Sequence, residues 1–259
     1  MSVRKLLDLT GKTAIVTGGS RGIGLQMALA LGEMGARVAL TARKKNELDE
    51  SRAELERAGI ECHTIASDLS QFDTIPGVVS SVLERWGPID ILVNNAGNGW
   101  GAPAEDYPDE AWRKVMSLNI DAQFFLCREV GKRSMLPRRS GKIINIASIA
   151  GLYGNPPGWK LQTVAYNTSK GALIQLTRTL AAEWGPHNIN VNAICPGFFP
   201  SKMSKVVLER MGADVIALTP LGRLGGEEDL KGSVVFLASE ASRHVTGQVL
   251  AVDGGCTAV

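Results

Sequence analysis

Seven short runs of apolar and β-branched residues recur along the chain, and longer stretches with helical spacing separate them. The runs are apolar almost without interruption, which is typical of strands buried on both faces of a sheet. Strands that alternate with helices indicate a parallel sheet covered by helices on both sides. We therefore expect one doubly wound α/β domain over residues 1–259, with a seven-stranded parallel sheet flanked by helices. The predicted strands are 13–17, 37–41, 61–66, 89–93, 142–147, 190–195 and 248–252.

A glycine-rich turn joins the first predicted strand to the helical pattern that runs from Leu25 to Met34. Glycine lets the backbone bend tightly and approach a diphosphate, while the first N–H groups of the helix face its charge. The spacing differs from the usual G-x-G-x-x-G dinucleotide fingerprint. Its position between strand and helix nevertheless predicts a Rossmann-like nucleotide site. The turn consists of Gly18, Gly19, Ser20, Arg21, Gly22, Ile23 and Gly24.

Tyr166 and Lys170 stand four positions apart in a stretch with helical spacing, so they project from one helix face. A free tyrosine titrates near a pH of about 10, and a cation within about 4–6 Å favours the phenolate. Such a pair can exchange a proton near neutral pH. The alternative is a half-buried tyrosine beside a solvated lysine.

Composition narrows the possible functions. The chain has 28 basic and 26 acidic residues and 44% hydrophobic residues, which argues for a sizeable core and against a nucleic-acid-binding surface. Four widely spaced cysteines, interpreted as core or surface thiols, and the lack of a signal-like or long apolar segment predict a reducing cytoplasm and no membrane association. Three scattered histidines show no metal-ligand spacing, so we expect no catalytic metal.

Taken together, these motifs resemble those of the short-chain dehydrogenase/reductase family, and the resemblance covers nearly every segment. The glycine turn has the family's Thr-Gly-x-x-x-Gly-x-Gly form. Four further matches occur in the family's order. They are Asn94-Asn95-Ala96-Gly97 after the fourth strand, Asn119 as the helix asparagine, Ser148 as the serine before the Tyr166/Lys170 pair, and Pro196-Gly197 as the turn beside the nicotinamide.

The resemblance implies an oxidoreductase that interconverts a ketone and a secondary alcohol by hydride transfer. Tyr166 would be the general acid or base, and Ser148 would hold the substrate oxygen. Lys170 would lower the pKa of Tyr166 and bind the nicotinamide ribose, and Asn119 would anchor a water. Alternatives are a loop hydroxyl for Ser148 and a helix-surface amide for Asn119.

The end of the second predicted strand indicates which cofactor binds. NAD-selective folds place an acidic residue about 20 residues beyond the glycines, where this chain has Ala42 followed by Arg43. Arg43, with Arg21 on the other side, would accept a 2′-phosphate, so we predict NADP(H). Asp68 and Leu69 resemble the family's adenine contact, although Asp68 is equally explained as a helix N-cap. The predicted cofactor site comprises Gly18, Ser20, Arg21, Gly22, Ile23, Gly24, Arg43, Asp68, Leu69, Asn95, Ala96, Gly97, Tyr166, Lys170, Pro196, Gly197, Phe199 and Ser201.

Two segments are expected to shape the substrate pocket. Ser148 and Tyr166 lie 18 positions apart, further than is common in the family, and the prolines and glycines between them predict an inserted loop over 151–163. Residues 197–222 form the expected lid, where Ser201 replaces the family's frequent threonine. The predicted pocket residues are Ser148, Trp100, Tyr153, Trp159 and Phe198; Tyr153 and Trp159 are equally explained as pins for the loop.

The chain looks most like bacterial ketoreductases of the gluconate 5-dehydrogenase or 3-oxoacyl reductase type. Its aromatic pocket residues favour an apolar or 3-oxoacyl ketone, with a sugar-acid or polyol dehydrogenase as the alternative. A dinucleotide-sensing protein without turnover would be expected to lack members of the catalytic set, and a methyltransferase would not require Tyr166 and Lys170. The resemblance also implies a homotetramer.

Overall fold

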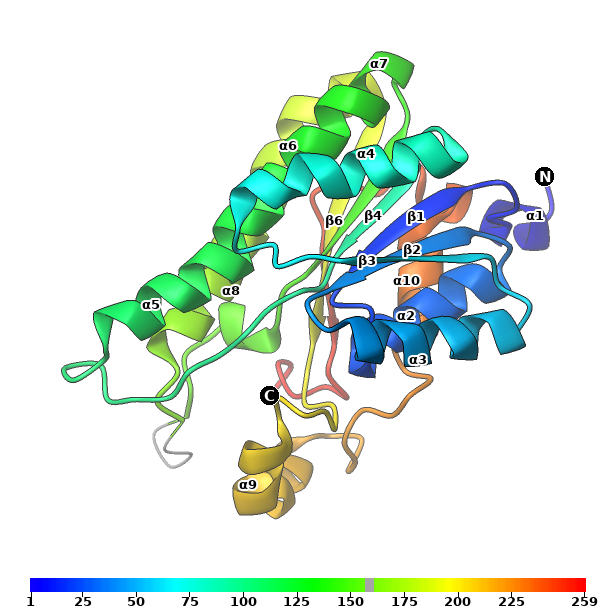
Figure 1. Ribbon diagram of the computed structural model, residues 1–259. Helices are drawn as coiled ribbons and strands as arrows, with labels where there is room; N and C mark the ends of the chain where they lie inside the picture. The colour runs from blue at the N-terminus through cyan, green and yellow to red at the C-terminus, as the bar shows by residue number, and fades with distance from the viewer. Residues whose placement is uncertain (157–160) are drawn as a thin grey trace.

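A computed structural model describes residues 1–156 and 161–259, and within them a seven-stranded parallel sheet forms the centre of the protein (Figure 1). The strand order is β3-β2-β1-β4-β5-β6-β7. β2 and β3 therefore extend the sheet on one side of β1, and β4 to β7 extend it on the other side. All seven predicted strands are confirmed, with ends that differ by at most two residues. The strands are β1 (Thr13–Thr17), β2 (Arg37–Ala42), β3 (Cys62–Ala66), β4 (Ile91–Asn94), β5 (Gly141–Ile146), β6 (Ile189–Pro196) and β7 (Val249–Val252).

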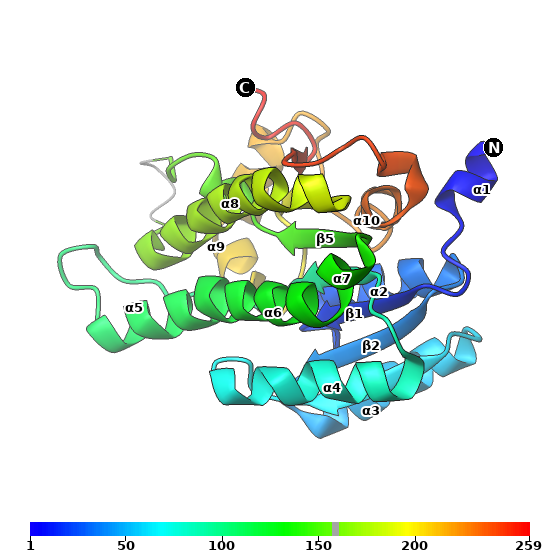
Figure 2. The ribbon, with the colours of Figure 1, turned by 90° about the horizontal axis from the view of Figure 1, so that it is seen from above.

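Helices cover both faces of the sheet, as the doubly wound prediction requires (Figures 1 and 2). One layer contains α2 (Gly22–Glu33), α3 (Lys45–Arg57) and α10 (Lys231–Ala238). The opposite layer contains α4 (Ile75–Trp86), α5 (Asp109–Met116), α6 (Ala122–Val130) and α8 (Val164–Trp184). The remaining helical segments are α1 (Val3–Leu7), α7 (Leu136–Arg138), α9 (Lys205–Leu218), η1 (Phe72–Thr74), η2 (Ser117–Asp121), η3 (Gly131–Met135), η4 (Ile149–Gly151), η6 (Gly185–His187) and η7 (Glu240–Ser242).

The side-chain alternation within β1 explains why the strands are apolar at every position. Ala14 and Val16 pack into the core cluster that includes residues of α2 and α10. Ile15, between them, packs into the cluster that includes residues of α4 and α6. Because successive side chains point to opposite faces and both faces are covered, neither set reaches water.

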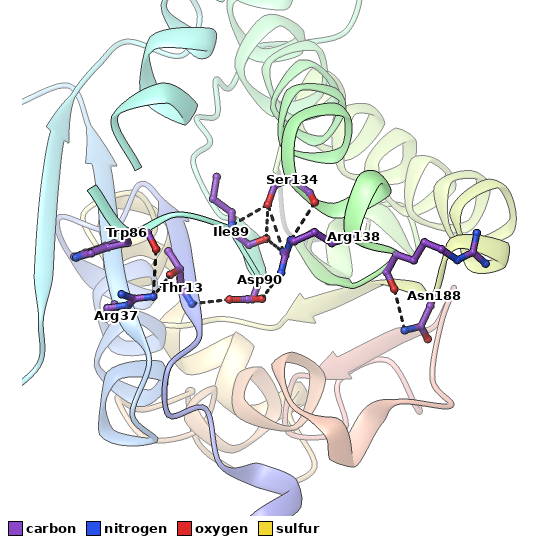
Figure 3. Close-up of polar contacts among 9 residues, drawn as sticks. Thr13, Arg37, Trp86, Ile89, Asp90, Ser134, Arg138 and Asn188 are labelled. Carbon is purple, nitrogen blue, oxygen red and sulfur yellow. Dashed lines mark hydrogen bonds and ion pairs between the residues drawn. The ribbon is translucent and has the colours of Figure 1, made fainter. Parts of the chain in front are cut away.

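A polar network fixes the amino ends of β1 and β4, at the opposite end of β1 from the glycine turn (Figure 3). Arg138 donates to Asp90 Oδ1 at 3.0 Å and to the Ile89 carbonyl at 2.7 Å. Asp90 Oδ2 in turn accepts from the backbone N–H of Thr13 at 3.0 Å. The Ser134 hydroxyl bonds both backbone groups of Ile89. These contacts hold the start of two adjacent strands against the helix that ends at Arg138.

Helix α9 lies apart from both helical layers, close to the C-terminus of the chain (Figure 1). Val215 is its only buried residue, whereas Val206, Ile216 and Leu218 are exposed. The helix falls within the predicted lid, 197–222. In the part of the chain that the structure describes, no helix combines the length and apolarity that a bilayer crossing requires.

The network around Arg138 generates a stability prediction. Arg138→Met keeps the apolar stem but leaves Asp90 and the Ile89 carbonyl without their charged donor, so the free energy of unfolding should fall by about 1–3 kcal/mol. Arg52→Met is the matched control, because Arg52 pairs with Glu56 on an exposed face of α3 and should change stability by less than about 0.5 kcal/mol. Urea unfolding measures both. Equal losses would show that the network does not stabilise the sheet.

Candidate active site

The glycine turn packs directly against the loop that follows β4. The Asn95 amide donates to the carbonyls of Thr17 at 2.8 Å and Gly18 at 3.1 Å. The Thr17 hydroxyl accepts from the backbone N–H groups of Asn95 and Ala96 at 2.9 and 2.8 Å. A Cβ atom at Gly24 would lie 2.3 Å from the Gly18 carbonyl oxygen, so no other residue fits there. The two loops therefore form one rigid surface at the carboxyl ends of β1 and β4.

The start of α2 suits an anionic group. Gly22 adopts a positive φ of 55°, and a Cβ atom there would meet only Ser201 Cβ, at 3.9 Å. No side-chain hydrogen bond caps the first N–H groups of this 12-residue helix. The positive end of the helix dipole and these N–H groups can therefore receive a diphosphate. The predicted residues of the turn thus fit a dinucleotide, and Ser201 lies beside them.

The predicted Tyr166, Lys170 and Ser148 are brought together beside the ends of β5 and β6. The Lys170 ammonium lies 5.7 Å from the centroid of the Tyr166 ring and donates to the Ile146 carbonyl at 2.7 Å. Ser148 follows β5, and its hydroxyl accepts from the Ala150 N–H at 3.1 Å. Because that bond uses a lone pair, the hydroxyl hydrogen stays available as a donor. Tyr166 itself is only partly buried.

Burial controls the ionisation of these groups. It lowers the pKa of Lys170 from 10.5 to about 8, and it raises the pKa of Tyr166, which a hydrogen bond with Ser148 opposes. The sequence led us to expect that Lys170 lowers the Tyr166 pKa. In the structure burial is the largest effect on the Tyr166 hydroxyl, and its pKa lies above the usual value. Burial also raises the pKa of the neighbouring Cys195 thiol to about 11.

Asn119 is fully buried within η2, a π-helical turn between α5 and α6. Its side-chain carbonyl accepts from the Asn98 N–H at 2.8 Å. Its amide donates to the Asn98 carbonyl at 2.9 Å and to the Ser169 hydroxyl at 3.0 Å. The helix-surface interpretation of Asn119 is therefore wrong. The side chain holds the loop after β4 against α8, beside Gly97, whose Cβ position is 3.7 Å from the Lys170 ammonium.

The two arginines predicted to bind a 2′-phosphate lie in different segments. Arg43 follows β2, and Arg21 lies within the glycine turn. Arg43 is exposed and has no hydrogen-bond or ion-pair partner within residues 1–156 and 161–259. Arg21 instead donates to the Glu47 carboxylate at 2.8 Å, and Lys44 donates to the same oxygen at 3.1 Å. Glu47 was not among the predicted site residues.

Other predicted cofactor residues contribute less than expected. The side chains of Leu69 and Phe199 are buried in core clusters. Phe199 fills the space against Gly225, where a Cβ atom would lie 2.4 Å from its ring. Asp68 accepts from the Ser70 N–H and hydroxyl in a local turn. Its alternative interpretation as a helix N-cap is wrong, because the next helical segment begins at Phe72 with Gln71 as its N-cap. Gly197 approaches Asp253 so closely that a Cβ atom would lie 2.8 Å from the Asp253 Cα.

The predicted substrate-pocket residues occupy different environments. Trp100 is 48% exposed and follows Gly99, whose Cβ position is 3.6 Å from the Tyr166 ring. Phe198 and Tyr153 pack against the small core cluster that contains Cys195. The Tyr153 hydroxyl also contacts the Cys256 sulfur at 3.7 Å, which agrees with a pinning role. Trp159 lies outside the described residues.

Gly151 and Glu47 were not identified by the sequence analysis, and Thr17 was identified only as the threonine of the glycine-turn motif. Gly151 allows η4 to touch α8, because a Cβ atom there would lie 2.6 Å from the Lys170 carbonyl carbon. Cys195 is buried, as are Cys62 and Cys127, which confirms core packing for these three thiols. Glu47 looked like an ordinary acidic residue in a helical first turn.

Comparison with known proteins shows that almost the whole chain is similar to dehydrogenases and reductases. Residues 18–257 match the family model described as Enoyl-(Acyl carrier protein) reductase. The chain is 40% identical to gluconate 5-dehydrogenase of Gluconobacter oxydans (strain 621H), with 99% of each chain covered. It is 39% identical to the rhamnolipids biosynthesis 3-oxoacyl-[acyl-carrier-protein] reductase of Pseudomonas aeruginosa, covering 96% of this chain and 97% of that protein. The crystal structure of a gluconate 5-dehydrogenase from Burkholderia cenocepacia J2315, in complex with NADP and tartrate, superimposes with a TM-score of 0.93 at 32% identity and covers all of both chains.

The buried Lys170 generates a prediction about pH and stability. Its pKa is about 8 in the folded protein and near 10.5 when exposed, so burying the ammonium costs about 3 kcal/mol at pH 7. That cost is fully present below pH 8 and disappears as the pH approaches 10.5. Lys170→Met removes the cost but loses the bond to the Ile146 carbonyl, so we expect a gain of about 1–2 kcal/mol at pH 7.

Urea unfolding of the wild type and Lys170→Met at pH 7 and 9.5 measures the gain. It should shrink at the higher pH, since the unfolded chain binds more protons than the folded protein between the two pKa values. Lys45→Met, on the exposed face of α3, controls for the loss of a lysine. A gain that grows with pH, or a less stable variant at pH 7, contradicts the prediction.

Proposed function

This chain belongs to the short-chain dehydrogenase/reductase family, and we propose that it is an NADP(H)-dependent oxidoreductase that interconverts a ketone and a secondary alcohol. The observation that supports this most strongly is the convergence of Ser148, Tyr166 and Lys170 at the strand ends, beside the loop after β4 that packs against the glycine turn. We assign the catalytic roles to Ser148, Tyr166 and Lys170, with Asn119 as the residue that positions them.

The cofactor follows from the residues around the glycine turn. The uncapped start of α2 would receive the diphosphate, and Gly97, Pro196 and Gly197 would line the nicotinamide side. Ala42 offers no carboxylate to a ribose hydroxyl, whereas Arg43 and Arg21 offer guanidinium groups to a 2′-phosphate. The NADP-bound relative from Burkholderia cenocepacia supports this choice.

Proton transfer falls to Tyr166. When bound, NADP(H) supplies or accepts the hydride at the substrate carbon. The Tyr166 hydroxyl donates its proton to the carbonyl oxygen in the reducing direction and takes it back in the oxidising one. Ser148 donates a hydrogen bond to the same oxygen, because accepting from the Ala150 N–H leaves its hydroxyl hydrogen free to turn from Tyr166 to the substrate. A phenol whose pKa burial keeps high remains protonated at neutral pH and is ready to act as the acid.

Lys170 and Asn119 support this step. Lys170 would bond the nicotinamide ribose, and the cation beside the Tyr166 ring favours the phenolate formed after proton donation. Asn119 has both ends of its side chain engaged by Asn98 and Ser169, so we propose a positioning role in place of the side-chain water anchor.

Two substrate classes are supported by different observations. Exposed Trp100 near Tyr166, together with exposed apolar residues on the proposed lid such as Met203 and Val206, favours an apolar or 3-oxoacyl ketone. The gluconate 5-dehydrogenase relative supports the second candidate, a sugar acid or polyol. We propose that the lid, 197–222, and the inserted loop, 151–163, decide between them.

The protein is further proposed to be a cytoplasmic homotetramer. Exposed Trp112 on α5 and Phe124 on α6 offer apolar contact area for a second copy, as does Leu250 on the edge strand β7. Four free thiols suit a reducing compartment. Light scattering on the purified protein measures the number of subunits directly.

The assignment of Tyr166 predicts that Tyr166→Phe loses about 10²–10⁴-fold in kcat, because the phenol supplies the proton. The Kd for NADPH should stay within a few-fold, since other residues hold the cofactor. Calorimetry gives Kd, and absorbance of NADPH gives kcat on a substrate for which chemistry limits the rate. Tyr107→Phe, which loses only a bond to the Trp100 carbonyl, is the control. Turnover that survives within a few-fold would exclude Tyr166 as the acid.

The substrate proposal predicts a higher kcat/KM for acetoacetyl-coenzyme A than for 5-ketogluconate, both with NADPH. The two carbonyl compounds present the same reacting group but differ in polarity, so an apolar pocket discriminates between them by desolvation. Trp100→Gln should reduce the ratio of the two kcat/KM values. A higher kcat/KM for 5-ketogluconate in the wild type would instead select the sugar-acid candidate.

A further inference from the structure

Glu47 contacts hydrogen-bond donors from two separate segments of the chain. Its Oε1 accepts from Arg21 of the glycine turn at 2.8 Å and from Lys44, just after β2, at 3.1 Å. The Ser20 hydroxyl lies 3.5 Å from Oε2. Burial raises the pKa of the Glu47 carboxyl, but the Lys44 hydrogen bond and the charges of Arg21, Lys44 and Lys202 outweigh it, so the pKa lies below its usual value. The carboxylate is therefore ionised at neutral pH.

A favourable contact with the helix dipole explains only part of this arrangement. An acidic residue in the first turn of α3 is stabilised by the helix dipole wherever its side chain points. Asp49, on the same helix, pairs with Lys45 and is 53% exposed. The side chain of Glu47 is 20% exposed and points away from α3, towards Arg21 in the glycine turn. The dipole therefore does not account for the contacts with Ser20 and Arg21.

The donors around Glu47 are those that a phosphate dianion would use. A guanidinium, an ammonium and a hydroxyl converge on one anionic group. Two of them, Ser20 and Arg21, belong to the proposed cofactor site, and Ala42 at the end of β2 leaves the ribose side open. A 2′-phosphate placed here would meet the Glu47 carboxylate as a like charge.

We propose that Glu47 is a specificity-determining residue, whose carboxylate occupies the donor cluster formed by the cations Arg21 and Lys44 and the Ser20 hydroxyl, and competes with the 2′-phosphate of NADP(H). This inference rests on the proposed position of the cofactor. Binding of NADP(H) must separate Glu47 from Arg21 and Lys44, whereas NAD(H), which has no 2′-phosphate, leaves the cluster intact. Glu47 thereby weakens the preference for NADP(H) and lets the protein accept NAD(H) as a second cofactor.

The test is direct binding to Glu47→Gln, which keeps the size of the side chain but removes its charge. Calorimetry should show the Kd for NADPH falling by roughly tenfold and the Kd for NADH staying within about twofold. Adenosine 2′,5′-bisphosphate should bind more tightly to the variant than to the wild type, and adenosine 5′-monophosphate equally to both. Asp49→Asn removes one negative charge from the same helix and should change none of these values.

An unchanged or higher Kd for NADPH in Glu47→Gln overturns the inference, as does an equal improvement for NADPH and NADH. The double variant Arg21→Ser/Arg43→Asp separates this failure from a misplaced phosphate site. If the double variant weakens NADPH binding while Glu47→Gln has no effect, the result supports the proposed phosphate site and refutes the proposed role of Glu47. If the double variant binds NADPH as the wild type does, both the proposed phosphate site and the proposed role of Glu47 are refuted.

Discussion

No side chain fits between Gly24 and the carbonyl oxygen of Gly18, and much of the site depends on this contact. It brings the start of α2 against the end of β1, so that the first N–H groups of the helix face the space above the sheet. Asn95 closes the same turn from β4, and Thr17 orders the loop that leads to Gly97. The position of the loop beside Lys170 therefore depends on hydrogen bonds between side chains and backbone groups that join it to Thr17, 78 and 79 residues earlier in the sequence.

The sequence predicted the parts of this protein that local patterns control. Apolar runs located all seven strands, because burial on both faces leaves no alternation to misinterpret. The glycine turn and the Tyr166/Lys170 pair were found because their spacing is itself geometric. Contacts between distant segments were not predictable in the same way. The π-helical turn around Asn119, the inward packing of Phe199 and the orientation of Glu47 each depend on a partner that no local pattern identifies.

The candidate active site also lowers the free energy of unfolding, because it contains a buried cation. Lys170 is buried with a backbone carbonyl as its hydrogen-bond partner, and the structure describes no carboxylate paired with it. The network of Arg138 and Asp90 joins the amino ends of the strands, far from this cation. The network lies at the amino ends of the strands, whereas the candidate active site lies at their carboxyl ends. The loops at the carboxyl ends can therefore differ between relatives named for gluconate and for 3-oxoacyl groups without disturbing the network.

The central position of β1 has a consequence for biosynthesis. β1, β2 and β3 are adjacent in the sheet and can pair as soon as they leave the ribosome, but the other edge of β1 pairs with β4. At about 5–20 residues per second, β4 follows β3 by one to several seconds. During that interval the nascent chain carries an apolar strand edge without its neighbour, which is a template for pairing with other chains. The same exposure recurs on β4, β5 and β6 until the next strand of each has been made, and those intervals are longer because more residues separate the strands.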